Sequence, residues 1–406
     1  MSVKELAHYA QIKGLDLIGT GDFTHPEWME ELKNTLTVVP ETQLYRPVSL
    51  SESQVYFMVT SEVCTIFEFK EKTKKIHHVI LTPSFEIAEQ ITDRLSKYGD
   101  MQSDGRPTLD MSAAELVEEV LNTSQQNVVF PAHAWTPWFS LFGAFSGFDR
   151  VEDCYQDRSR DIFALETGLS SDPPMNWRLS ALDRVALVSN SDAHSPWPWR
   201  IGREANVFEL EEISYSEVID AIREKDPKRF LFTIETNPAY GKYHWTGHRN
   251  CSFSVPPSEA IKLGNRCPVC KRKLTEGVEQ RVEKLADRPS GFRPEAAIDY
   301  KHLLPLHEII AATLGIDSLS SPTVWKIFNS LVSKFGNEFT VLLQPSLEAL
   351  STVVEPRIAE AIIRVREDRV KVEPGYDGVY GKLVFTEETR EDEDAKSGQT
   401  ELERFI

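Results

Sequence analysis

An aspartate and a histidine, separated by one residue, follow a short apolar run. Residues 185–188 have the pattern of a fully buried strand, and Asp192 and His194 come just after it. Side chains released together at the carboxyl end of a buried strand are held in fixed positions, as in the active sites of α/β barrels. A carboxylate beside an imidazole can hold a metal ion. The alternative is that Asp192 caps the next element and His194 packs beside it.

The same arrangement recurs along the chain. The ligand-type residues are Asp22 and His25 after residues 15–18, Glu62 within 59–63, His77 and His78 within 75–81, His133 after 128–130, and Glu166 after 162–165. Several strands of one sheet would then point Asp, Glu and His toward one rim. Imidazoles with carboxylates suit zinc, manganese or iron, whereas an all-oxygen set would suit magnesium or calcium. The pattern therefore predicts a metal site.

Composition limits the class of protein. A chain of 406 residues is expected to form two or three domains. Its five cysteines are odd in number and scattered, which indicates a reducing compartment. No apolar stretch reaches the length of a membrane span and residues 1–20 lack a signal-peptide core, so we expect a cytoplasmic protein without membrane contact. The net charge of −18 opposes nucleic-acid binding by the whole chain, but the charge is unevenly distributed.

Helical patterns alternate with the apolar runs through about residue 235. Residues 2–14 are predicted to form a helix that ends at Gly14. Residues 84–124 are predicted to form two helices around an irregular loop, and Ser112 with Glu115 has the spacing of a capping box at the second. This alternation predicts an α/β fold with a mostly parallel sheet or barrel.

Aromatic residues crowd around His133 in the segment 131–143, and residues 166–178 again place polar side chains next to tryptophan. The first loop could simply close the top of a core, or it could form a platform on which an unpaired nucleobase stacks. The candidate substrate-binding residues are Trp135, Trp138, Glu166, Ser170, Asn176, Arg178 and Asn190.

A second metal-binding pattern lies within residues 243–290. His248 and Cys251, followed by Cys267 and Cys270, form an H-x2-C…C-x2-C set, which fits one tetrahedral zinc site. The alternative is four unconnected side chains with reduced thiols, and His244 is an alternative ligand. Lysines and arginines gather around this set, which suggests a place for the DNA backbone.

The rest of the chain is predicted to be largely helical from 301 to 372, with apolar helical patterns at 347–354 and 358–365. An ordinary packing domain is the simplest interpretation. Residues 386–397 are dominated by charged and small side chains, which predicts a disordered linker. The terminal pattern resembles peptides that bind sliding clamps of the archaeal and eukaryotic type, and a chance match is the alternative. Its residues are Gln399, Leu402, Phe405 and Ile406.

The series Gly-Thr-Gly-Asp22, Ser-Glu62, His77-His78, Pro-Ala-His133 and Ser-Asp192-Ala-His194 resembles the polymerase-and-histidinol-phosphatase (PHP) family of metal-dependent phosphoesterases. Residues 131–143, 166–178 and 189–206 are specifically similar to the endonuclease Q group. These DNA-repair nucleases nick on the 5′ side of deaminated bases, such as uracil, hypoxanthine and xanthine, and of abasic sites. The resemblance runs from residue 1 to the C-terminus.

The resemblance implies a PHP-type distorted (β/α)7 barrel, in which metal ions orient a hydroxide and neutralise charge on the attacked phosphate. The implied metal ligands are Asp22, His25, Glu62, His77, His133, Asp192 and His194. The implied catalytic residues are Glu62, His133, Asp192 and His194. The active-site ions would be zinc, manganese or magnesium, beside one structural zinc at His248, Cys251, Cys267 and Cys270. Damaged DNA and a sliding clamp would be the partners of a monomeric enzyme.

The implied organisation is a PHP domain at 1–240, a zinc-binding module at 241–290, a helical DNA-clasping domain at 291–385 and a tail at 386–406. One departure concerns the first strand, which in PHP proteins carries His-x-His. Nothing upstream of Asp22 supplies this pair, and His8 stands alone on a predicted helix. Either the recorded start is late or two ligands have been lost, and a match that begins in mid-motif favours a late start.

Two other functions remain open. One is a PHP phosphatase that acts on a small phosphate ester and has a purely structural zinc module. The other is a catalytically impaired DNA-binding homologue, if the His pair is truly absent. The length of the chain and the basic zinc module favour the nuclease. No Gly-x4-Gly-Lys-Ser/Thr phosphate loop occurs, so an ATP-driven helicase or ligase has no support.

Overall fold

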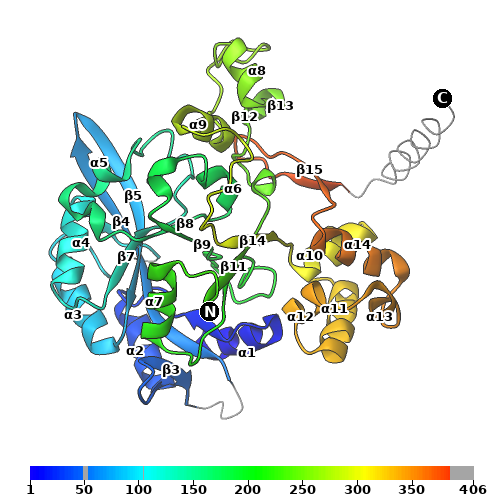
Figure 1. Cartoon of the computed structure of the whole chain (residues 1–406), viewed down its shortest axis with the longest axis horizontal. Coiled ribbons are helices and arrows are strands. Elements are labelled where there is room, and N and C mark those ends of the chain that lie inside the picture. The colour runs from blue at the N-terminus through cyan, green and yellow to red at the C-terminus, as the bar shows by residue number, and fades with distance from the viewer. Residues whose placement is uncertain (49–53, 104, 385–406) are drawn as a thin grey trace.

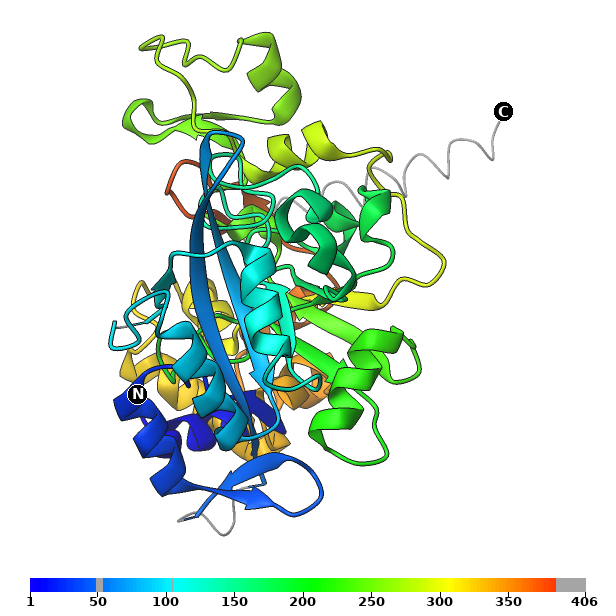
Figure 2. The same ribbon diagram turned by 90° about the vertical axis from the view of Figure 1, so that its left-hand side faces the viewer.

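A long hairpin of strands β4 (Tyr56–Phe69) and β5 (Lys72–Thr82) runs through the main sheet of the computed structural model, which describes residues 1–48, 54–103 and 105–384 (Figures 1 and 2). Lys70 and Glu71 turn the chain with φ values of 49° and 61°. Positive φ at both central residues is typical of tight hairpin turns whose twist matches that of the flanking strands. The two strands therefore pair antiparallel along almost their whole length.

The hairpin belongs to a seven-stranded sheet with the order β2-β3-β4-β5-β7, in which β1 and β6 also pair with β4. The other strands are β1 (Leu17–Gly19), β2 (Leu36–Val39), β3 (Leu44–Pro47), β6 (Thr108–Leu109) and β7 (Val128–Pro131). Only β1 and β6 run parallel to their neighbour, β4. The prediction of a mostly parallel sheet is wrong here, because a two-residue turn joins antiparallel strands and parallel neighbours need a long crossover.

Helices lie along one side and the lower end of this sheet (Figure 1). They are α1 (Val3–Lys13), α2 (Pro26–Thr35), α3 (Phe85–Leu95), α4 (Ala113–Leu121) and α5 (Val151–Tyr155). The predicted ends of α1 are confirmed, because Ser2 caps its start and Gly14 follows its end with a left-handed φ of 95°. The predicted capping box of Ser112 and Glu115 is also confirmed at the start of α4.

Two smaller sheets lie beside the seven-stranded sheet. Strands β8 (Ala164–Glu166) and β9 (Ala186–Val188) pair in parallel, and β11 (Phe230–Glu235) lies between antiparallel β10 (Ala205–Phe208) and parallel β14 (Asp299–His302). Within the described ranges, β1 pairs only with β4, and β10 pairs only with β11. A cavity of about 1130 Å³ is lined by both β1 and β10.

Short helices connect these strands and the regions that follow. They are α6 (Pro173–Asn176), η1 (Gln156–Arg160), η2 (Ser180–Leu182), α7 (Tyr215–Glu224), η3 (Pro238–Tyr240) and η4 (Arg249–Cys251). A small unit then projects at the top of Figure 1, made of β12 (Thr246–His248), β13 (Phe253–Val255), α8 (Pro257–Lys262) and α9 (Val278–Leu285).

A separate group of helices, α10 to α14, lies at one side of the molecule in Figure 1. They are α10 (Leu306–Leu314), α11 (Pro322–Phe335), α12 (Glu338–Leu343), α13 (Leu347–Ser351) and α14 (Pro356–Arg366), followed by β15 (Lys371–Glu373) and β16 (Lys382–Val384). The predicted helices at 347–354 and 358–365 are thus confirmed. A buried ion pair of 2.8 Å between Lys13 and Glu338 ties α12 to α1.

The tail predicted to be disordered and its clamp-binding pattern at 399–406 lie outside the described residues. Among the helices that are described, none combines the length and apolar character needed to cross a membrane.

Candidate active site

Three of the side chains predicted to bind metal converge in the structure. Glu62 Oε1 lies 3.0 Å from His77 Nδ1 and 3.2 Å from His133 Nε2, and these two imidazole nitrogens are 3.0 Å apart. All three ligand atoms lie within 4.8 Å of one another. One carboxylate and two imidazoles at this spacing can hold a divalent metal ion.

The register of the β4–β5 hairpin explains why His77, and not His78, joins this group. Glu62 is opposite Val79, and Cys64 is opposite His77, so Glu62 and His77 are diagonal neighbours on one face. His78 points to the other face, where its nitrogens lie 2.9 Å from the hydroxyls of Thr65 and Tyr155. Burial lowers the pKa of His78 to about 3, so its imidazole is a neutral part of the core.

Arg106 joins the metal-binding group to Asp192. Its Nε lies 2.6 Å from Glu62 Oε1, and its Nη2 lies 2.6 and 2.7 Å from the two carboxylate oxygens of Asp192. His194 is 75% exposed, with its Nε2 3.5 Å from Asp192 Oδ1. The guanidinium therefore occupies a position between two carboxylates that suits a cation. Arg106 was not predicted, because an isolated arginine in a loop carries no signal in the sequence.

The remaining predicted ligands line the large cavity without joining the close group. Asp22 and His25 are on its wall, together with Glu62, Asp192 and His194. His25 stands at the start of α2, and its backbone N–H donates to the carbonyl of Asp22 at 2.9 Å. Among the described residues, the structure thus brings Glu62, His77 and His133 into contact and places the other four on the surrounding walls.

The electrostatics favour an ionised carboxylate at the centre. Burial alone would raise the pKa of Glu62, but hydrogen bonds with His133 and His77 and the charge of Arg106 hold it well below its ordinary value. Burial lowers the pKa of His77. For His133, the hydrogen bond to Glu62 outweighs burial and raises the pKa. Metal binding requires an anionic Glu62 and neutral imidazoles, so a bound ion would release any proton held by His133.

Three candidate residues adopt backbone conformations that non-glycine residues rarely take. Asp22, His133 and Asp192 have φ values of 44°, 31° and 43°. Such conformations cost of the order of 1–3 kcal/mol each and persist where surrounding contacts enforce them. One such contact is the hydrogen bond that the His133 N–H donates to Glu166 Oε2 on β8, at 3.0 Å. A Cβ on Gly168 would lie 2.7 Å from the His133 Cβ, so the loop closes tightly over this ligand.

Glu166 is a buried residue on the wall of the large cavity. Its burial raises the pKa to about 8. The carboxyl group accepts from the His133 N–H, and its backbone carbonyl accepts from Ala134 N at 3.0 Å. Glu166 therefore holds the His133 loop in place.

The aromatic loop after β7 divides into buried and exposed residues. Trp135 packs in the core, and its Nε1 donates to the Oδ1 of Asn176 at 2.7 Å. Asn176 is also buried, so Trp135 and Asn176 brace the loop in this structure, and their contact with a substrate stays a prediction. The indole of Trp138, by contrast, is exposed.

The other candidate substrate-binding residues have different surroundings. Asn190 lines the large cavity, and its Oδ1 accepts from Asn206 Nδ2 at 3.1 Å. Ser170 is half-buried after β8. Arg178 forms an ion pair of 2.7 Å with Glu283 on α9, so it joins the 166–178 segment to the small unit formed by β12, β13, α8 and α9.

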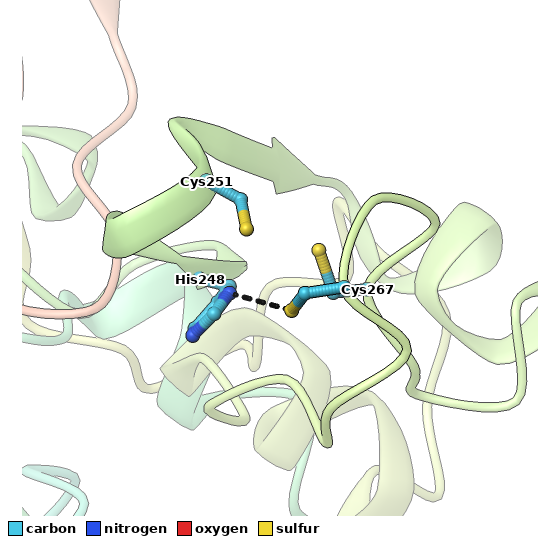
Figure 3. Close-up of side chains that lie close together, drawn as sticks. His248, Cys251 and Cys267 are labelled. Atoms are coloured by element: carbon cyan, nitrogen blue, oxygen red, sulfur yellow. Dashed lines mark hydrogen bonds between the residues drawn. The ribbon is translucent and has the colours of Figure 1, made fainter.

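The four side chains of the second predicted metal site also lie close together. His248, Cys251, Cys267 and Cys270 place their ligand atoms within 4.8 Å of one another, and His248 Nδ1 lies 3.4 Å from Cys270 Sγ. Figure 3 shows the side chains of His248, Cys251 and Cys267 facing a common centre. Although desolvation opposes it, hydrogen bonds from the Cys270 and Val269 backbone lower the pKa of Cys267 to about 6, which favours the thiolate that zinc binds. His244 lies apart, with Nε2 3.6 Å from Glu279.

Parts of the chain are similar to known proteins in sequence. Residues 305–369 match the family described as the MJ0043 C-terminal domain. The uncharacterised protein MJ0043 of Methanocaldococcus jannaschii is 33% identical over 261 residues, which are 62% of this chain and 31% of that protein. The chain thus spans about a third of the length of this relative.

Two solved structures are similar over almost the whole chain. The lesion-specific endonuclease PfuEndoQ from Pyrococcus furiosus has a TM-score of 0.84 and 32% identity, over 95% of this chain and 91% of that one. A structure of endonuclease Q in complex with a 27-mer duplex, with an abasic lesion at its active site, has a TM-score of 0.83 and 32% identity. It is matched over 96% of this chain and 92% of its own.

Fold and site together define a nuclease, an enzyme of the hydrolase class. The chain belongs to the endonuclease Q family.

Proposed function

We propose that this protein is a metal-dependent DNA-repair endonuclease that hydrolyses the phosphodiester on the 5′ side of a deaminated base or an abasic site. The observation that carries the proposal is the close group of Glu62, His77 and His133, whose Glu62 lines a large cavity. It is supported by the likeness to an endonuclease Q that is bound to an abasic duplex.

The proposed fold is a PHP-type barrel formed by residues 1–240. Residues 241–290 would form the zinc module, 291–385 the helical DNA-clasping domain and 386–406 the tail. The proposed ligand set around Glu62, His77 and His133 includes Asp192, His194, Asp22 and His25 on the cavity walls. Its mixture of imidazoles and carboxylates fits zinc, manganese or iron, and magnesium would rely more on the carboxylates.

The residues of the chain have separable tasks in this proposal. A divalent cation bound at the site would act as a Lewis acid on a phosphoryl oxygen. Glu62 and the two imidazoles would bind it, and Glu166 would keep His133 in position. Arg106 can exchange its carboxylate partners for a phosphate, which a guanidinium binds in the same planar geometry. Asn190 offers a hydrogen bond to a base in the cavity, and Ser170, half-buried after β8, is a further candidate contact.

The partners follow from the same proposal. Damaged DNA would be the substrate of a monomeric, cytoplasmic enzyme. One zinc at His248, Cys251, Cys267 and Cys270 would hold the small unit together. Gln399, Leu402, Phe405 and Ile406 would attach the enzyme to a sliding clamp.

A nicking assay tests the proposal. We would incubate the purified protein and manganese or magnesium with duplexes that contain one uracil, one hypoxanthine, one abasic site or no lesion. The expected result is a single nick on the 5′ side of the lesion and an intact control duplex. Hydrolysis of a small phosphate ester such as p-nitrophenyl phosphate, with no cleavage of any duplex, would favour a phosphatase and overturn the proposal.

A further inference from the structure

Two aromatic rings stack on each other at the surface beside the metal-binding group. The centroids of Trp138 and Phe145 are 4.7 Å apart, and the rings are inclined by 12°. Trp138 is 40% exposed and Phe145 is 46% exposed. The edge of Tyr243 meets Trp138 at 5.3 Å. Large apolar side chains gathered at one exposed place mark a binding surface more often than isolated ones do.

The loop that carries this stack is folded tightly on itself. The N–H of Phe145 donates to the carbonyl of Pro137 at 3.0 Å, and the N–H of Phe139 donates to Ser146 Oγ at 2.9 Å. A Cβ on Gly147 would lie 2.4 Å from the backbone nitrogen of Gly143, so only glycine permits this close approach. The two rings are therefore presented by a preorganised loop.

Direct contacts join the stack to the candidate metal ligands. Thr136 Oγ1 lies 3.1 Å from His133 Nδ1 and donates to the carbonyl of Trp138 at 3.0 Å. The ring of Phe139, next to Trp138, lies 5.1 Å from the ring of His77. A molecule lying on the stack would consequently lie close to the site at which phosphate is attacked.

The charge around the stack indicates an anionic partner. Lys75 Nζ lies 5.3 Å from the Phe139 ring centre, and Lys242 Nζ lies 5.5 Å from that of Tyr243. Over the part of the chain that is described, neither lysine has a carboxylate oxygen within 4.0 Å. Such cations are notable in a chain of net charge −18. A flat apolar surface flanked by cations matches a nucleobase joined to its phosphates.

We propose that the Trp138–Phe145 stack is the surface on which DNA places the base left unpaired opposite the lesion. The proposal rests on the proposed function and extends it, because it assigns a contact to the undamaged strand, away from the lesion itself. Stacking on an aromatic face tolerates any base, so this contact would help to hold an opened duplex regardless of its sequence.

Binding and photocrosslinking test this assignment without requiring turnover. The probe is a duplex with an abasic site and 5-iodouracil opposite it, and no divalent metal is added. Affinity is measured by fluorescence anisotropy for the wild type, Trp138→Ala, Phe145→Ala and Trp138→Phe. Phe292→Ala is the matched control, because Phe292 is also exposed but packs on Arg288 elsewhere. Irradiated complexes are digested, and the crosslinked residue is mapped by mass spectrometry.

We expect the two alanine variants to bind the probe roughly tenfold more weakly, while Trp138→Phe and Phe292→Ala stay near wild type. The wild-type crosslink should map to Trp138 or Phe145. Weaker binding with a crosslink that maps outside residues 132–150 would reveal an indirect structural effect and overturn the assignment, as would unchanged binding. The proposed function fails separately if the wild type neither prefers nor nicks lesion-containing duplex.

Discussion

The guanidinium of Arg106 lies against the carboxylate of Glu62, with Nε 2.6 Å from Oε1. Because the same guanidinium also contacts Asp192, it neutralises two acidic side chains in the place where a metal cation would act. Burial alone would lower the pKa of Arg106, but the charges and hydrogen bonds of these two carboxylates outweigh burial, and the net effect is a pKa above the ordinary value. Arg106 and a divalent cation should therefore compete for the same negative charge.

This competition predicts the behaviour of Arg106→Gln. Without added metal, the variant should lose about 1–3 kcal/mol of unfolding free energy, because two carboxylates lose their partner. Manganese should then stabilise it more than it stabilises the wild type. Thermal melting with and without manganese measures both effects. Arg150→Gln is the control, because the pair of Arg150 with Glu152 is exposed and contributes little. Equal metal responses of Arg106→Gln and the wild type would contradict the competition.

The His248, Cys251, Cys267 and Cys270 group predicts the effect of removing one ligand. Cys267→Ser should release about one equivalent of zinc and loosen residues 243–290 before the main sheet, because structural zinc contributes directly to folding. Elemental analysis and amide hydrogen exchange report these two changes. Cys154→Ala serves as the control, because Cys154 is a buried cysteine outside the group. Full zinc retention by Cys267→Ser would exclude it as a ligand.

His302 predicts a pH-dependent part of the stability. Its nitrogens lie 3.2 Å from Asp172 and 3.1 Å from Asp368, and its ring meets that of Tyr300. Burial opposes the charged form, but the two aspartates raise the pKa of His302 to about 9. The contribution is therefore fully present below the unfolded pKa of about 6.5 and disappears as pH rises through about 9.

Chemical denaturation between pH 6 and pH 9.5 measures this contribution. The wild type should exceed His302→Gln by on the order of 2 kcal/mol near pH 6, and the difference should shrink toward pH 9.5. A difference that stays constant over this range would show that the imidazolium is not its source.

The pattern at residues 399–406 predicts binding to a sliding clamp that is independent of nicking. Deletion of residues 399–406 should abolish pull-down by a sliding clamp and leave intrinsic nicking unchanged, because the residues of the metal-binding group lie elsewhere in the chain. Leu402→Ala with Phe405→Ala should have the same effect in the full-length chain. Clamp binding by the truncated chain that equals that of the intact chain would refute the assignment.

The sequence predicted features that depend on residues a few positions apart, such as helix caps and paired metal ligands. The capping residues of α1 and α4 specify where these helices begin, because a side-chain oxygen beside unsatisfied N–H groups acts over one turn. Residues of ligand type within or just after apolar runs predicted a metal site, and three of them lie together. Paired ligands with a short spacing likewise predicted the His248 and Cys251 group.

Features that depend on tertiary contacts could not be predicted in this way. The resemblance named His77 as the ligand, but the residue pattern alone left His77 and His78 open. The choice follows from the register of a hairpin whose turn, Lys70-Glu71, lacks the usual Asn-Gly signal. The antiparallel pairing of β4 and β5 was missed for the same reason. Arg106 contacts Glu62 from a loop that is distant in the sequence. Trp135 is buried, and Asn176 accepts its N–H. None of these partners is adjacent in the sequence.

The most direct test of the account compares Glu62→Gln with Glu68→Gln on a duplex that contains one abasic site. Both residues lie on β4, but Glu62 contacts His77 and His133, whereas Glu68 is exposed and contacts Thr73. Loss of the central carboxylate should reduce the single-turnover nicking rate at least about a hundredfold and lower the metal content, with little loss of folding. Glu68→Gln should nick like the wild type on the 5′ side of the lesion. Wild-type nicking by Glu62→Gln with unchanged metal content would contradict the central claim.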